Sequence, residues 1–251
     1  MGTLLAIDIG NTRTKWGVHS AQIWNERGVT ETVRLTSFAA QLLEYKNINK
    51  INKIVVSSVA EKNITDAFVF QLQQFGVEVR LVRAREKQCG VINHYNAPEQ
   101  LGADRWCALI AAHGFHKGHA VVVMAGTAMT IDALTADGNF LGGDIVPGIS
   151  LMQDALRHRT ANLRAESGAY SLFPVRTQDA IHSGIISASV GAITQMRGAM
   201  KSAGYDDAAC VISGGAAEML LPHIRQPVMR VDNLVLDGIL QIANSEITES
   251  S

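Results

Sequence analysis

The stretch "LLAIDIGNTRTKWGV", residues 4–18, places an aspartate inside an apolar strand and follows it with a polar turn. The apolar residues between Leu4 and Ile9 predict a buried β-strand, and Gly10-Asn11-Thr12 predicts the turn into a second strand. Asp8 interrupts the apolar run, and burying a carboxylate is unfavourable unless it is paired, hydrogen-bonded or close to a metal ion. The stretch therefore predicts a hairpin in which Asp8 has a chemical role.

The turn of this hairpin offers backbone N–H groups and hydroxyls, which suit phosphate oxygens. Gly10 allows close approach because it has no Cβ atom, Thr12 adds a hydroxyl, and Lys15 can neutralise phosphate charge. Asp8 would then hold Mg²⁺ beside a triphosphate, because Mg²⁺ keeps most of its waters and binds through few carboxylates. The alternative is an ordinary hairpin in which Asp8 accepts hydrogen bonds from turn N–H groups, and this stretch alone does not decide between the two.

A second hairpin with the same pattern is predicted in "HAVVVMAGTAMTIDAL", residues 119–134. Gly10 and Gly126 are 116 residues apart, and Thr14 and Thr130 share that offset, which is close to half of the 251 residues. Two copies of one α/β unit explain this spacing, with the active cleft between them. The alternative is that two glycine-containing hairpins arose independently within one α/β domain.

The rest of the chain alternates between the two kinds of element, so the predicted fold class is α/β. We predict two halves, residues 1–115 and 116–251, with helices over 36–47, 61–75, 104–115, 149–163, 180–204 and 232–245 and strands over 53–60 and 77–82. A third glycine turn, "SGGAAE" at 213–218, separates a predicted strand from a helix and can bind an anion or admit an adenine ring.

Composition narrows the function class. The chain has 22 basic and 23 acidic residues, so no basic surface is available for nucleic acid or for a membrane. No apolar run approaches the roughly 20 residues that span a bilayer, and the first residues enter a strand rather than a signal peptide. Three widely spaced cysteines without a CxxC pair favour a reducing compartment. We expect a cytoplasmic protein that binds small molecules.

The segment "YNAPEQLGADRWCALIAA", residues 95–112, is the candidate site for a second substrate. Asp104 can accept the proton of an alcohol, and Arg105 can bind an anionic end of the same molecule. An exposed aspartate near its ordinary pKa of about 3.9 would be ionised at pH 7 without further tuning. The alternative is that Asp104 only caps a helix that begins at Arg105.

In this order, the motifs resemble those of type III pantothenate kinases, which belong to the sugar-kinase, actin and chaperone ATPase superfamily. The similarity runs almost end to end, and its motifs here are "DIGNTRTKWGV", "YNAPEQLGADRW", "GTAMTID", "GGDIVPGISLM", "TQDAIHSG", "SGGAAEML" and "DNLVLDGIL". The pair "LGADRW" and "GGDIVPG" is the most specific part of the resemblance. It implies two ribonuclease H-like halves.

The resemblance also implies an activity, which is ATP-dependent phosphorylation of pantothenate to 4′-phosphopantothenate, the first step of coenzyme A synthesis. It implies Mg²⁺, a monovalent cation (K⁺ or NH₄⁺) and a homodimer in which one subunit contributes to its neighbour's pantothenate pocket. Asp104 corresponds to the general base. The implied pantothenate contacts are Tyr95, Gly102, Ala103, Asp104, Arg105 and Thr177, and the implied ATP contacts are Asp8, Ile9, Gly10, Asn11, Thr12, Arg13, Thr14, Lys15 and Thr127.

One position departs from the family pattern. Members of the family often carry an aspartate three residues before the threonine of "GTA", where it helps to hold the monovalent cation, and this chain has Met124. Two other functions stay open: a nucleotide-binding regulator of the same fold without catalysis, and a kinase for another small hydroxy acid.

Overall fold

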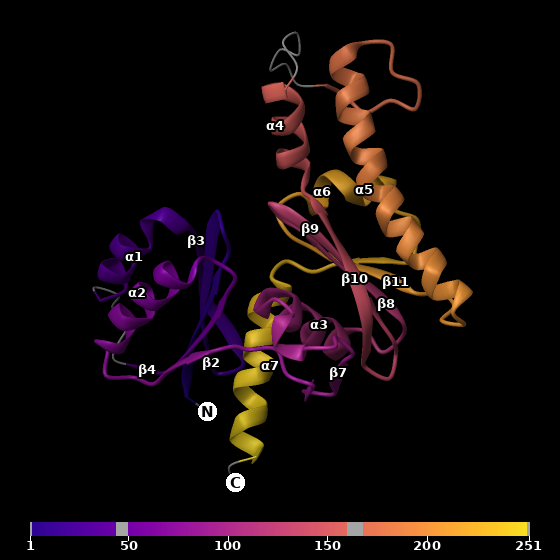
Figure 1. Cartoon of the computed structure of the whole chain (residues 1–251). Coiled ribbons are helices and arrows are strands. Elements are labelled where there is room, and N and C mark those ends of the chain that lie inside the picture. The colour runs from indigo at the N-terminus through magenta and orange to yellow at the C-terminus, as the bar shows by residue number, and fades with distance from the viewer. Residues whose placement is uncertain (1, 44–49, 160–167, 250–251) are drawn as a thin grey trace. The chain divides into compact units, whose positions relative to one another are not determined.

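The computed structural model describes residues 2–43, 50–159 and 168–249 (Figure 1). The ends of two predicted helices, at 44–47 and 160–163, lie outside these residues. The chain forms two compact units, one of residues 1–111 with 234–251 and the other of residues 112–233. The division at residue 115 stays a prediction, and residues 234–251 group with the first unit rather than with the second.

The first unit contains a five-stranded sheet in the order β3-β2-β1-β4-β5. Its strands are β1 (Thr3–Ile9), β2 (Arg13–Ser20), β3 (Ile23–Glu31), β4 (Ile51–Ser58) and β5 (Val79–Leu81). Neighbours among β1, β2 and β3 are antiparallel, whereas β4 pairs with β1 and β5 with β4 in parallel. A short antiparallel pair follows, formed by β6 (Lys87–Gln88) and β7 (Val91–Asn93).

Alternation along β1 divides its side chains between two faces of the sheet. Ile7 and Ile9 join a core with Phe38 and Phe68 from α1 (Leu35–Leu43) and α2 (Lys62–Gln73). Asp8 points to the opposite face. The helix α7 (Leu234–Glu249) contacts β1, and it approaches α3 (Ala103–Phe115) so closely that a Cβ on Gly238 would lie 2.0 Å from the Cys107 carbonyl oxygen.

The second unit repeats this topology. Its strands follow the order β10-β9-β8-β11-β12, and they are β8 (Ala120–Ala125), β9 (Ala128–Leu134), β10 (Asn139–Pro147), β11 (Ala209–Ser213) and β12 (Val228–Arg230). Again three consecutive strands are antiparallel and two more extend the sheet in parallel. The prediction of two duplicated α/β halves is therefore confirmed.

Helices complete the second unit. α4 (Ile149–Arg159) and α5 (Thr177–Ser202) contact each other and lie side by side in Figure 1, and α6 (Ala217–Leu220) follows β11. Ile185 and Ile193 of α5 pack against Val121, Val123 and Ile131 of the sheet. Among the described residues, no helix combines the length and the hydropathy that a membrane span requires.

Several elements differ from the sequence expectation, and the short strands β6, β7 and β12 were not predicted. The strand β3 was not predicted, because most of its residues are exposed and it shows no clear apolar alternation. The helix α3 begins at Ala103, one residue before the predicted range 104–115 and two residues before Arg105, where the capping alternative placed its start. The earlier start of α3 changes the interpretation of Asp104.

Candidate active site

Asp8 lies at the next-to-last position of β1, between one partner residue on each neighbouring strand. It pairs with Lys15 on β2 and with Ser57 on β4. Because residues directly opposite each other in a sheet point to the same face, the three side chains share one surface. The strand register thus brings a carboxylate, an ammonium group and a hydroxyl together.

The carboxylate of Asp8 is poorly compensated. Its Oδ1 atom is buried and has no hydrogen-bond partner among the described residues, and the same holds for the Ser57 hydroxyl. Burial, and then the nearby charge of Asp104, raise the pKa of Asp8 from 3.8 to about 7, although Lys15 opposes the shift. A cation beside Asp8 would relieve this unfavourable charge, so the residues fit Mg²⁺, which is commonly held by one or two carboxylates and substrate phosphates.

Asp104 is not the N-cap of its helix. The backbone N–H of Trp106 donates to the Gly102 carbonyl oxygen at 3.0 Å, which makes Gly102 the cap residue and places Asp104 in the first turn. The Asp104 Oδ1 atom accepts a hydrogen bond from the Arg105 backbone N–H at 2.7 Å. A Cβ on Gly102 would lie 2.7 Å from that same oxygen, so glycine leaves room for the carboxylate.

The expectation of an exposed Asp104 with an ordinary pKa is also wrong. The residue is half-buried, and this burial raises the pKa of Asp104, while the Arg105 N–H and guanidinium act in the opposite direction. A higher pKa makes the carboxylate a stronger base for an alcohol proton.

Arg105 and Tyr95 form a rigid pair beside Asp104. Arg105 is only 4% exposed, and its Nη1 atom donates to the Tyr95 hydroxyl at 2.9 Å. Asn93 orders the loop, because its Oδ1 atom accepts from the Tyr95 N–H at 3.1 Å and its Nδ2 atom donates to the Pro98 carbonyl oxygen at 3.0 Å. No sequence pattern indicates this role for Asn93, because it depends on the loop conformation.

The structure thus brings together most of the predicted pantothenate contacts. Tyr95, Gly102, Asp104 and Arg105 all belong to one short segment of the first unit, and the buried side chain of Ala103 lies between them in the chain. The remaining residue, Thr177, is the exposed first residue of α5 in the second unit.

The first turn is built much as predicted. The Gly10 N–H donates to the Arg13 carbonyl oxygen at 3.1 Å, which leaves Asn11 and Thr12 exposed at the tip. The side chain of Ile9 is fully buried, so this residue can offer only its backbone to a ligand.

Thr14 has a different environment from the other turn residues. It is fully buried, and its Oγ1 atom lies 3.2 Å from the hydroxyl of Thr32, which donates to the Gly10 carbonyl oxygen at 2.7 Å. These contacts support a role for Thr14 in holding the turn, and its contact with ATP stays a prediction. Thr32 was missed because it lies 18 residues from Thr14 in the chain.

The second unit presents an equivalent turn. The Gly126 N–H donates to the Ala128 carbonyl oxygen at 3.2 Å, and Thr127 is exposed beside it. The Gly148 N–H donates to the Thr127 carbonyl oxygen at 2.9 Å, and a Cβ on Gly148 would lie 2.1 Å from the Gly126 oxygen. Asp132, the carboxylate of "GTAMTID", is fully buried within β9 and is not part of this turn.

The third glycine turn packs against β8. Gly214 has a φ of +108°, which L-residues rarely adopt, and a Cβ there would lie 2.4 Å from the Ala125 carbonyl oxygen. That oxygen accepts a hydrogen bond from the Ala216 N–H at 3.1 Å. The glycine is therefore required by the backbone of the turn.

Met124 occupies in β8 the position that Asp8 occupies in β1. It is the next-to-last residue of its strand and pairs with Thr130 on β9 and with Ser213 on β11. The Thr130 hydroxyl is buried and has no hydrogen-bond partner among the described residues.

Within residues 2–43, 50–159 and 168–249, no group of three or more His, Cys, Asp or Glu side chains could hold a metal ion.

Comparison with known proteins gives the family. A family model for type III pantothenate kinases matches residues 4–199. A type III pantothenate kinase from Nitrosospira multiformis is 40% identical over 243 residues, covering 96% of this chain and 90% of that protein. The enzyme of the same name from Dechloromonas aromatica is 40% identical over 242 residues, covering 96% and 98%.

Solved structures support the fold. MreB5 of Spiroplasma citri, bound to ADP, aligns with a TM-score of 0.59 over 100% of this chain and 98% of its own, at 8% identity. At that identity the similarity concerns only the two-unit α/β architecture. The agreement of sequence over nearly the whole length is what identifies the relatives, and the chain belongs to the type III pantothenate kinase family.

Proposed function

We propose that this protein transfers the γ-phosphoryl group of ATP to the primary hydroxyl of pantothenate, giving 4′-phosphopantothenate for coenzyme A synthesis. The proposal rests on one observation: the carboxylates of Asp8 and Asp104 lie close enough for their charges to interact, in a chain of this family. Phosphoryl transfer mainly requires positioning and charge neutralisation, with little covalent chemistry from the protein.

Asp104 is the general base in this proposal. Its carboxylate accepts the proton of the pantothenate hydroxyl, and burial makes it a stronger base than an exposed aspartate. The Arg105–Tyr95 pair orients the acceptor, because its hydrogen bond fixes both side chains next to the helix start. The anionic end of pantothenate is the group that a guanidinium recognises best.

The glycine turns position ATP. Asn11, Thr12, Arg13 and Thr127 are exposed at the two turns, where their backbone and side-chain groups can meet phosphate oxygens. Asp8 would hold Mg²⁺, which supplies neutralisation of phosphate charge when bound. Lys15, on the neighbouring strand, adds a second positive charge on the same face.

A monovalent cation, K⁺ or NH₄⁺, is part of the proposal in a modified form. At the position where the family pattern places an aspartate, this chain offers the thioether of Met124, which is a poor ligand for K⁺. We infer that the cation binds through other oxygens and more weakly than it would beside a carboxylate.

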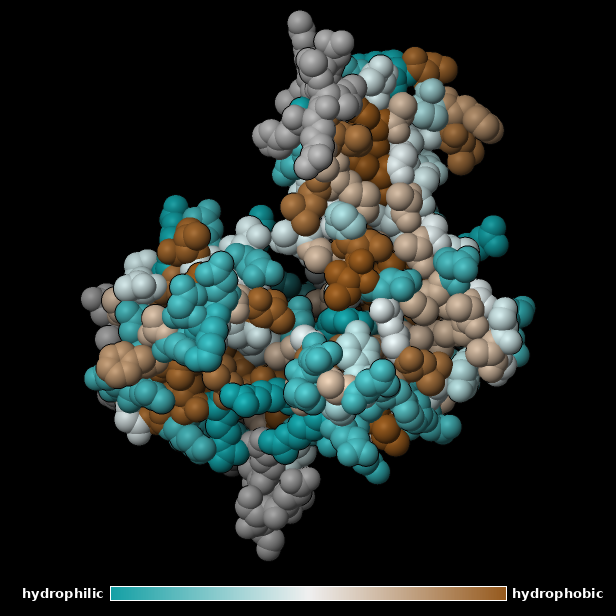
Figure 2. All heavy atoms as spheres, in the orientation of Figure 1, coloured by the Kyte–Doolittle hydropathy of each residue, from teal (hydrophilic) through white to brown (hydrophobic). Residues whose placement is uncertain are grey.

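The homodimer is proposed from the surface of α5 and the segment before it. Gly184, Ala188 and Gly191 are exposed along this helix, and hydrophobic atoms gather at the surface around α4 and the start of α5 in Figure 2. Leu172 and Phe173, just before α5, are 78% and 87% exposed. Exposed apolar surface of this kind is typical of interfaces, so Thr177 at the start of α5 is available to a partner.

The test is ADP release coupled to an indicator enzyme, with pantothenate compared against pantetheine and several sugars. We expect turnover with pantothenate and not with the sugars. A protein that binds ATP but turns over none of them would be a regulator, and a preference for another hydroxy acid would change the substrate. The three free thiols suit a reducing compartment, so we place this reaction in the cytoplasm.

A further inference from the structure

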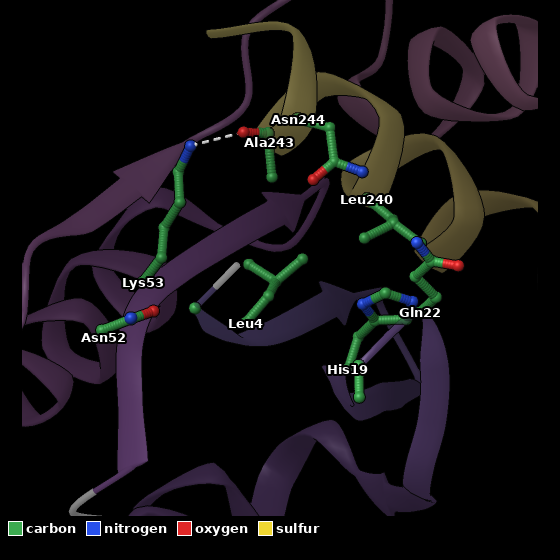
Figure 3. A pocket seen from close by; sticks show the side chains of 10 residues that line it. Leu4, His19, Gln22, Asn52, Lys53, Leu240, Ala243 and Asn244 are labelled. Carbon is green, nitrogen blue, oxygen red and sulfur yellow. Dashed lines mark hydrogen bonds between the residues drawn. The ribbon is translucent and has the colours of Figure 1, made fainter. Parts of the chain in front are cut away.

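A cavity in the first unit lies away from the two carboxylates. Its volume is about 340 Å³, within the roughly 300–1,000 Å³ range of small-molecule sites. Its lining includes Leu4, His19, Gln22, Asn52, Lys53 and Leu240 (Figure 3). Leu4 precedes Asp8 by four residues on β1, roughly 13 Å along an extended strand, so the cavity is separate from the site proposed for ATP.

The wall of the cavity combines one positive charge with several neutral polar groups. Lys53 is the only lining residue with a permanent charge, and its Nζ atom donates to the Ala243 carbonyl oxygen at 2.8 Å. Burial lowers the pKa of His19, so its imidazole is neutral at pH 7. In Figure 3, Lys53 and Asn52 lie on one side of the cavity and His19 and Gln22 on the other.

The floor and roof of the cavity are apolar. Leu4 lies between the two polar sides in Figure 3, and Leu240 of α7 lies above it. A ligand that fills this space therefore needs an apolar part as well as an anionic group. A phosphate dianion would require more than one cation for its desolvation, whereas a carboxylate is matched by one ammonium group and nearby amides.

The turn between β2 and β3 supplies an independent observation. Ala21 has a φ of 51° and Gln22 a φ of 66°, both in the left-handed region. Two-residue turns of this type favour Asn-Gly, because a Cβ atom disfavours the left-handed conformation at each position. The turn keeps two such residues, and both line the cavity. Retained strain of this kind is a feature of ligand sites.

Two acidic residues lie near the cavity but do not line it. Glu78 is exposed and forms an ion pair with Arg80, at 2.8 Å between Oε1 and Nε. Asp237 accepts a hydrogen bond from Trp24 Nε1 at 3.0 Å. The charge of Glu78 also acts on Lys53, and that of Asp237 acts on His19, so a carboxylate in the cavity would compete with Glu78 for Lys53.

We propose that this cavity binds a small organic molecule with an apolar body, whose carboxylate is held by Lys53 and whose second polar group is held by the carboxamide of Gln22 on the opposite side. The site is distinct from the phosphoryl-transfer site, and the inference does not depend on the substrate of that site. It adds a second small-molecule site to the unit that carries Asp8 and Asp104.

The probe is N-acetyl-leucine, which combines a carboxylate, an amide and a branched apolar side chain. N-acetyl-leucinamide is the matched uncharged control, since it differs only at the carboxylate. Isothermal titration should give a Kd on the order of 1 mM for the acid and at least tenfold weaker binding of the amide. Trp24 fluorescence offers a second readout, because its ring packs edge-on against His19 at 5.1 Å between centroids.

Lys53→Met should weaken binding of the acid about tenfold or more, because it removes the charge and keeps the apolar stem. Lys62→Met, at an exposed position on α2, is the control and should bind as the wild type does. Equal affinity of acid and amide, or unchanged binding by Lys53→Met, would overturn the proposal.

A second pair of variants keeps the test independent of the folding of Lys53→Met. Gln22→Gly and Ala21→Gly both remove a left-handed side chain, so neither should lower the melting temperature. Only Gln22→Gly removes the carboxamide, and it should weaken the probe severalfold, whereas Ala21→Gly should not. If both variants bind N-acetyl-leucine like the wild type, the turn has no role in binding and the proposed site is wrong.

Discussion

Asp8 links ionisation to stability at the scale of a single residue. Its pKa is about 7 in the folded protein and close to 3.8 in the unfolded chain, so the folded state binds the proton more tightly. Proton binding to Asp8 therefore stabilises the folded state relative to the unfolded chain. This contribution to the free energy of unfolding is fully present below about pH 4 and is lost as the pH rises through about 7. Each unit of the shift corresponds to about 1.4 kcal/mol.

Asp8→Asn should therefore stabilise the metal-free protein, and the gain should grow between pH 5 and pH 8. We expect up to a few kcal/mol at pH 8, reduced by whatever solvent reaches the carboxylate. Urea unfolding in EDTA at both pH values measures this, with Asp206→Asn as an exposed control. The same gain at both pH values would contradict the assigned ionisation. Turnover should be strongly reduced, because the proposed Mg²⁺ ligand is lost.

Asp104→Asn tests the proposed base. The amide keeps the shape and the hydrogen bond from the Arg105 N–H but cannot take a proton, so kcat should fall roughly 10²- to 10⁴-fold. ATP affinity and the melting temperature should change little. Glu99→Gln, at an exposed position in the same motif, is the matched control. A variant that keeps the wild-type kcat would leave Asp104 with only a structural role.

The hydroxyl pair of Thr14 and Thr32 belongs to the scale of the elements, because it joins the end of β3 to the β1–β2 turn. Thr32→Val removes the hydrogen bond to the Gly10 carbonyl oxygen and should destabilise the protein by about 1–2 kcal/mol. KM for ATP should rise more than KM for pantothenate. Thr30→Val, two residues earlier on β3, is the control. An equal rise in both KM values would show that the pair only supports the fold.

The end of β8 carries the prediction on the monovalent cation. Met124→Asp restores a carboxylate between Thr130 and Ser213, so half-maximal activity should require less K⁺ than in the wild type. Met124→Asn separates the effect of an oxygen ligand from that of charge. Titration of K⁺ and NH₄⁺ in a sodium-free Tris buffer measures the requirement. The same half-saturating K⁺ in all three proteins would remove this position from the cation site.

The elements differ in how well the sequence predicts them, for physical reasons. The β1–β2 hairpin was predicted because an apolar run stops at a glycine turn. The strand β3 was missed because most of its side chains face solvent and leave no periodic pattern. The start of α3 was misplaced because Asp104 is a favourable cap residue, whereas the structure uses the Gly102 carbonyl oxygen.

The candidate active site likewise has one part that the sequence predicts and another that depends on the folded structure. A buried carboxylate at Asp8 can be inferred from the sequence, since its strand neighbours are apolar. Its proximity to Asp104 cannot, because 96 residues separate the two and only the resemblance to a family connected them. Asn93 and Thr32 act through hydrogen bonds that depend on the folded loop and turn, so no local pattern indicates them.

The proposed sharing of active sites concerns the whole molecule and its partner. Thr177→Arg should block the neighbouring subunit's pocket, and Asp104→Asn should disable its own. If the two inactive proteins are unfolded and refolded together, about half of the dimers are mixed, and each mixed dimer has one intact site. About a quarter of the wild-type activity should return. Mixed dimers that form but stay inactive would assign Thr177 to its own subunit.

The placement of α7 has a consequence for how the protein is made. Residues 112–233 form the second unit, and the chain returns afterwards to complete the first with the helix that contacts β1. On the ribosome, the second unit can fold while the first still lacks this helix. The face of β1 that carries Asp8 is therefore completed last, and a nascent chain released before residue 234 would hold a finished second unit beside an open, incomplete first one.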